Sequence, residues 1–199
     1  MSGAGQITGG GGFTPVTSIK EAEDWAMKNI DGIKNVNFGK YSIEQANSVL
    51  DEISNLQVKF GKLGDMESIE VVGKRQKFAG RMQGGKNLQL RVDITDAYNK
   101  RAFEMGLTKS KPGLAGLVDH EIGHTMTPHI FDVSVRPPKM TKFGEGLDKF
   151  FKANKDKIKT EISDYAATAR HEFVAEVFAL RENNTAPKWA IKFMNEWNI

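Results

Sequence analysis

Two histidines and a glutamate form a compact motif just past the middle of the chain. Residues 120–124 read His-Glu-Ile-Gly-His, so His120 and His124 are four residues apart. On an α-helix with about 3.6 residues per turn, this spacing places both imidazoles on one face. Glu121 projects roughly 100° around the axis from His120, beside a shared cation and not onto it. The motif therefore predicts two ligands of a divalent metal ion and a carboxylate that can act as a base on water.

The surrounding residues predict the helix that this chemistry requires. Segment 112–127 begins with Pro112, which suits a first helical position, and Pro128 follows its end. Its apolar residues fall on one side of the helix: Leu114, Leu117, Val118 and Ile122. One large group of zinc peptidases has a third His ten residues after the first, but Ile130 stands there. His129 misses that position by one residue, so we interpret it as a loop or surface histidine.

A third ligand is predicted from a later acidic segment, in which residues 171–176 read His-Glu-Phe-Val-Ala-Glu. Glu172 and Glu176 share one helix face, so one carboxylate can bind the metal while the other hydrogen-bonds a histidine ligand. The alternative is a solvated acidic stripe on a surface helix. His171 points about 100° away from Glu172 and is expected at the rim, outside the metal set.

Around these residues the chain resembles a known family. Tyr165, the seven-residue step to Glu172 and the run EFVAEVF at 172–178 are similar to the zincin-like (gluzincin) metallopeptidase domain of the anthrax toxin lethal factor type. They also resemble the related zincin-like domains of phage head-morphogenesis proteins and bacterial effectors. The likeness runs from about Gly113 to the C-terminus, includes Ala186-Pro187-Lys188, and is weak over the first hundred residues. Val174 is a departure, because a second Phe is common there.

The resemblance implies a zinc-dependent endopeptidase with one Zn²⁺. It implies that His120, His124 and Glu172 bind the ion, and that Glu121 is the base that takes a proton from zinc-bound water and gives it to the leaving amine. It further implies that Tyr165 lies at the metal-bound water or the oxyanion, and that Glu176 supports a ligand from outside the metal set. The expected partner is a protein or peptide substrate.

Two other classes of function remain open. In the first, the fold is a structural or delivered component of a phage virion or a secreted effector, with capsid or delivery partners. The intact Glu121 speaks against a non-catalytic copy, because metal binding alone needs no base there.

The second alternative is nucleic-acid binding, based on a lysine-rich segment between the two motifs. A solvated helix face explains that segment more simply, and a rim that attracts acidic substrates is the other interpretation. The lysines are Lys139, Lys142, Lys149, Lys152, Lys155, Lys157 and Lys159.

The predicted fold is an α+β zincin-like domain over residues 17–199, mostly helical with a small mixed sheet, after a flexible glycine-rich tail at 1–16. Helices and the sheet occupy 17–110, and a helical half with the metal ligands occupies 111–199. Capping boxes at Ser18 and Ser42 predict helices over 19–30 and 43–60, and a last helix is expected over 186–197. Strands are expected over 67–72 and 88–92, with a turn at 84–85. The resemblance to zincin-like domains implies that segment 88–92 is an edge strand above the site, where a substrate peptide would pair beside Leu88 and Leu90.

Composition limits the remaining possibilities. The 199 residues are 39% hydrophobic, which is enough for a sizeable core, and the formal net charge of +3 is mild. Cysteine is absent, so any zinc must be held by nitrogen and oxygen atoms. No stretch approaches the roughly 20 apolar residues of a membrane span, and residues 1–12 do not resemble a secretory signal. We therefore expect a soluble protein, and the sequence leaves open whether it works in a phage particle, in a bacterial cytoplasm or inside a recipient cell.

Overall fold

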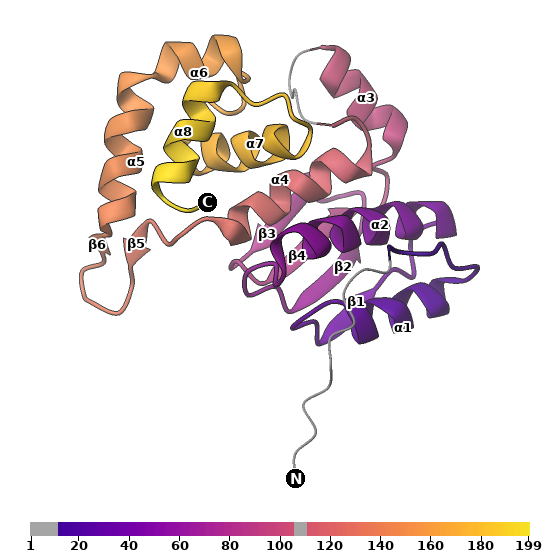
Figure 1. Ribbon diagram of the computed structural model, residues 1–199. Helices are drawn as coiled ribbons and strands as arrows, with labels where there is room; N and C mark the ends of the chain where they lie inside the picture. Colours follow the sequence, from indigo (N-terminus) through magenta and orange to yellow (C-terminus); the bar gives the residue numbers. More distant parts are fainter. Residues whose placement is uncertain (1–11, 106–110) are drawn as a thin grey trace.

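One central helix, α4 (Leu114–Met126), separates a small sheet and its two helices from a second group of helices in the computed structural model. The model describes residues 12–105 and 111–199, and about half of the chain is helical. Figure 1 shows the sheet with α1 and α2 on one side of α4, and α5 to α8 on the other. The predicted α+β class with a small mixed sheet is therefore confirmed.

The sheet has the strand order β1-β2-β4-β3. Strands β1 (Asn35–Asn37), β2 (Ser68–Val72) and β4 (Asn87–Arg91) are parallel, whereas β3 (Gly80–Gln83) runs antiparallel to β4. The turn from β3 into β4 uses Gly84 and Gly85 at φ 63° and 71°, a left-handed backbone that favours glycine. The predicted strands at 67–72 and 88–92 and the turn between them are thus confirmed.

The prediction that segment 88–92 is an edge strand is wrong. Strand β4 pairs with β2 on one side and with β3 on the other, and Leu88 and Leu90 are fully buried. Their alternation with polar residues correctly indicated one buried face, but alternation does not say where a strand lies in its sheet. The edge next to α4 is β3, whose four residues carry no apolar alternation.

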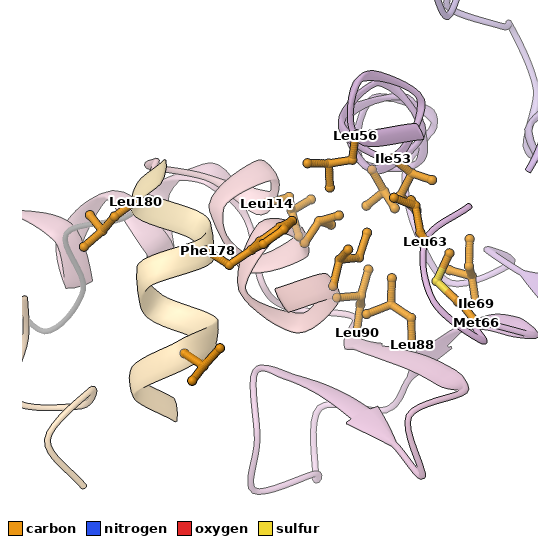
Figure 2. Packing of buried hydrophobic residues seen from close by; sticks show 14 of the residues in the cluster. Ile53, Leu56, Leu63, Met66, Ile69, Leu88, Leu90, Leu114, Phe178 and Leu180 are labelled. Carbon is orange, nitrogen blue, oxygen red and sulfur yellow. The ribbon is translucent and has the colours of Figure 1, made fainter. Parts of the chain in front are cut away.

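Helices α1 (Ile19–Asn29) and α2 (Ile43–Phe60) begin where their capping residues predicted. The Ser18 side chain accepts the Glu21 N–H, and Ser42 and Gln45 form a complete capping box. Figure 2 shows the apolar core that α2 builds with the sheet and α4. This core includes Ile53, Leu56, Leu63, Met66, Ile69, Leu88, Leu90 and Leu114. Because the same core packs one face of α4, it fixes the direction of the motif on the other face.

The described part of the predicted tail, residues 12–16, packs against the helices. The ring of Phe13 meets Trp25 edge-on at 4.8 Å between centroids. The backbone of Val16 exchanges two hydrogen bonds with the Asn47 side chain, at 3.2 and 3.0 Å. Phe13 and Val16 thus contact α1 and α2. Residues 1–11 of that prediction lie outside the described residues.

Helix α3 (Asp96–Glu104) precedes α4, and a hairpin of β5 (Phe131–Asp132) and β6 (Lys139–Met140) follows it. The chain then forms α5 (Lys142–Ala153), α6 (Lys155–Glu161), α7 (Arg170–Glu182) and α8 (Lys188–Glu196). Stacked rings of Phe150, Phe173, Trp189 and Phe193 hold this helical half together. Within residues 12–105 and 111–199, no helix is both long and apolar enough to cross a bilayer.

Candidate metal centre

Helices α4 and α7 pack directly against each other and bring the two acidic motifs together (Figure 1). They come close together at Gly123, where an added Cβ would lie 3.0 Å from the Ala175 Cα. A side chain at position 123 would push the helices apart. The glycine inside the His-Glu-Ile-Gly-His motif thus allows the close packing that places Glu172 opposite the two histidines.

His120, His124 and Glu172 converge as the sequence predicted. One nitrogen or oxygen from each side chain lies within 4.8 Å of the other two. Glu172 Oε2 is 3.0 Å from His120 Nε2 and 3.5 Å from His124 Nε2. Three ligands at tetrahedral angles around Zn²⁺, with bonds of about 2.0–2.1 Å, stand about 3.3 Å apart. The spacing and the nitrogen–nitrogen–oxygen set therefore fit zinc.

Glu176 holds His120 from the side opposite Glu172. Glu176 Oε1 is 2.8 Å from His120 Nδ1, and both side chains are buried. The Ser163 hydroxyl donates a 3.1 Å hydrogen bond to Glu176 Oε2 and accepts the Ala166 N–H at 2.9 Å. With Nδ1 engaged, Nε2 is the His120 atom that faces the shared centre. Sequence reasoning anticipated this use of one of the two glutamates but missed Ser163, which belongs to no motif.

The electrostatics of the centre favour a positive charge among these residues. Burial by itself lowers the pKa of His120, but hydrogen bonds with Glu172 and Glu176 outweigh it and raise the pKa well above its usual range. Burial raises the pKa of Glu172, but hydrogen bonds with His120, His124 and His171 depress it far below its usual value. A proton or a divalent ion can supply that charge, and a metal ion requires that the imidazole first lose its proton.

Glu121 is 5% exposed, and its side chain lies against Gly80 of β3. A Cβ added at Gly80 would lie 3.0 Å from Glu121 Oε1, so the carboxylate lies directly against this strand. Burial is the main cause that raises the pKa of Glu121, while His120 and His124 act in the opposite direction. A hydrogen bond with the Met82 backbone also connects it to β3. A buried carboxylate with a raised pKa suits a general base.

Tyr165 and His171 complete the surroundings of Glu172. The Tyr165 ring centroid lies 5.6 Å from that of His120, and the side chain is 46% exposed. Burial, followed by the charge of Glu172, raises the pKa of Tyr165, which keeps its hydroxyl a donor. His171 Nε2 is 3.2 Å from Glu172 Oε1, so this rim residue lies closer to the ligands than its position on the helix indicated. His129 is exposed, lines the same cavity as His124 and Glu172, and does not belong to the group of three converging ligands.

A cavity of about 920 Å³ opens over the centre. Glu121, His124, Tyr165, His171 and Glu172 line one part of it. Strand β3 and the turn after it, residues 80–82 and 84–86, line another part. The cavity therefore gives two of the three ligands, His124 and Glu172, and the candidate base access to the same space, beside an edge strand.

Comparison of the chain with protein-family models, with curated proteins and with solved structures gives no match.

Proposed function

We propose that this protein is a zinc-dependent metalloendopeptidase with a zincin-like fold. The observation that carries the proposal is the convergence of His120, His124 and Glu172, together with Glu121 in the same cavity. Two helices far apart in the sequence contribute these residues, and a buried base next to a nitrogen–nitrogen–oxygen set serves hydrolysis better than it serves structural metal binding.

The residues of the chain have distinct tasks in this proposal. Zinc, when bound, would supply a Lewis acid that polarises the scissile carbonyl and makes water more acidic. Glu121 accepts the proton of the attacking water and later transfers it to the departing amine, which its raised pKa favours. Tyr165 remains protonated and can donate a hydrogen bond to the oxygen that becomes negative. Glu176 keeps His120 in its orientation.

Strand β3 is the element that we propose for binding the substrate backbone. It lies at one end of the sheet order, and it lines the cavity beside Glu121. An extended peptide can pair with such an edge, so that main-chain hydrogen bonds set its position relative to the base. This role replaces the one expected for Leu88 and Leu90, whose side chains lie in the core.

The proposal is tested by metal analysis of the purified chain and by digestion of a peptide library with and without a chelator. We expect about one zinc per chain and cleavage that the chelator abolishes. The substitution Glu121→Gln should retain zinc and lose turnover by about 10²- to 10⁴-fold. Glu145→Gln, an exposed position on α5, is the matched control and should cleave like the parent. Equal turnover by Glu121→Gln and the parent would remove Glu121 as the base.

A second candidate is a structural or delivered component of a virion or effector. The hairpin of β5 and β6 favours it, because three apolar side chains there are exposed: Phe131 at 43%, Val133 at 78% and Val135 at 37%. Exposed apolar clusters mark interaction sites. This candidate predicts a stoichiometric zinc ion with no cleavage of any peptide in the library.

A further inference from the structure

A second hollow, of about 450 Å³, adjoins the central cavity. It lies where the end of α5 and the start of α6 meet the start of α7, and residues 168–171 form one of its walls. His171 lines both the hollow and the central cavity, and its imidazole also contacts Glu172. A chain bound across the metal centre can therefore place a neighbouring side chain in this second hollow.

The second hollow carries an excess of positive charge. Lys152 and Arg170 both bind Asp148, through its two oxygens at 2.7 and 2.8 Å. Two cations thus share one carboxylate. Lys155, which also lines the hollow, has no ion pair among the described residues. Asp148 is the one acidic side chain in this lining, so about two positive charges remain for a ligand to neutralise.

The far part of the central cavity has the same sign of charge. Its lining includes three cations, Lys62, Arg81 and Lys86, and one carboxylate outside the metal centre, that of Asp65. Lys62 pairs with Asp65, and Lys86 pairs with Glu67. Arg81 stacks over Phe78 at 4.3 Å and, in the described part of the chain, has no carboxylate partner. Cations therefore line both cavities, and a bound divalent ion would add to the positive field.

The other lysines of the lysine-rich segment do not contribute to either cavity. Lys157 lies over the Trp189 ring at 4.6 Å, and Lys159 faces Asp164 at 3.6 Å. Lys149 is exposed on α5 and lines neither hollow. A solvated helix face accounts for these residues. It does not account for Lys152 and Lys155, which line the second hollow.

We propose that the second hollow is a subsite for an acidic side chain, with Lys155 as its anchor, and that the substrates are peptides with Asp or Glu close to the cleaved bond. This inference rests on the proposed function, which it extends to a class of substrate. Lys155 supplies the unpaired charge, while Lys152 and Arg170 can share their bonds between Asp148 and the incoming carboxylate. The Lys152 side chain is 74% exposed, so the cost of moving its ammonium group between Asp148 and the incoming carboxylate is small.

Binding tests the subsite separately from catalysis. The zinc-loaded full chain with Glu121→Gln is titrated with two fluorescent peptide pools, identical except that Glu in one pool is Gln in the other. We expect the Glu pool to bind about three- to tenfold more tightly at low salt, and the difference to shrink as salt screens it. Adding Lys155→Glu should abolish the preference. This variant should fold, because an acidic residue is favourable in the first turn of a helix.

Lys149→Glu is the control, because it makes the same change in net charge outside the hollow. The subsite is refuted if the Glu121→Gln protein binds both pools equally, or if adding Lys149→Glu reduces the preference as much as adding Lys155→Glu. The peptidase proposal is then still judged by cleavage of the peptide library. If the Glu pool is preferred through Lys155 but no peptide is cleaved, the peptidase proposal and the substrate class fail, and the hollow stands only as a binding site for an acidic side chain. Tighter binding of a single-stranded oligonucleotide than of the Glu pool, lost in Lys155→Glu, would also overturn the inference.

Discussion

The Ser163 side chain supports the candidate metal centre through a chain of two hydrogen bonds. Its hydroxyl holds Glu176, and Glu176 holds Nδ1 of His120. Loss of such outer contacts typically weakens metal binding by 10- to 100-fold. We expect Ser163→Ala to lower zinc affinity by about tenfold, the lower end of that range, because Glu176 itself remains. Competition with a chromogenic chelator measures this. Ser54→Ala, at a buried serine of α2, is the control, and equal affinities for the two variants would contradict the assignment.

Asp119 precedes the first proposed ligand and is fully buried, and its carboxyl group lies beside that of Glu52. Burial, followed by the adjacent Glu52, raises the pKa of Asp119 far above its usual value, since the two carboxyls can bond only when one is protonated. Above about pH 4 the unfolded chain loses this proton and the folded chain keeps it, so the free energy of unfolding falls as pH rises.

Asp119→Asn removes this titration. Denaturant unfolding of both proteins in chelator, from mildly acidic to mildly alkaline pH, should show a stability that falls less steeply for the variant. We expect the variant to be the more stable protein at the alkaline end by about 1 kcal/mol or more, since one unit of pKa shift corresponds to about 1.4 kcal/mol. Stability curves that remain parallel over the whole range would show that Asp119 does not keep its proton.

At the scale of elements, the sequence predicted what local periodicity and caps determine. Helices α1, α2, α4 and α8 and strands β2 and β4 carry such signals, and the four-residue steps at His120 and Glu172 placed each pair on one helix face. Contacts between distant segments carry no such signal. The position of β4 inside the sheet, the Ser163–Glu176 hydrogen bond and the anchoring of Phe13 all depend on partners from other elements. The sequence did not predict strand β3, because its strand conformation depends on pairing with β4 and not on a pattern in its own residues.

The contact between α4 and α7 makes Gly123 an element-scale test. Alanine favours a helix by about 1 kcal/mol over glycine, but here its Cβ would lie 3.0 Å from Ala175 Cα and 3.1 Å from Ala175 O. Overpacking costs about 1–3 kcal/mol, so Gly123→Ala should be neutral to about 2 kcal/mol less stable. Zinc affinity should fall, because Glu172 moves away with α7.

Unfolding by denaturant and zinc competition measure both effects of Gly123→Ala. The control is Gly73→Ala, because a Cβ there has nothing within 4 Å. A gain in stability equal to the intrinsic preference for alanine, with zinc affinity unchanged, would show that α4 and α7 are not held at this distance by the glycine.

For the whole molecule, the candidate centre lies on the boundary between two halves. The sheet and α2 pack on α4 from one side, and α7 brings the helices of the second half from the other. Two of the proposed ligands belong to α4 and the third to α7. An ion bound by all three would therefore link the N-terminal sheet and the C-terminal helices through one point.

This arrangement predicts how zinc changes global stability. An ion that binds the folded state at 100 times its dissociation constant stabilises by about 2.7 kcal/mol. For a chain of this length that raises Tm by about 5–10 °C. Thermal unfolding in zinc and in chelator measures the shift, and hydrogen exchange should slow in both α4 and α7. Glu172→Ala should lose most of the shift, because α4 alone then offers two histidines and no link to the second half. An undiminished shift in Glu172→Ala would place the ion on α4 alone, so the halves would have to be joined by packing without the metal.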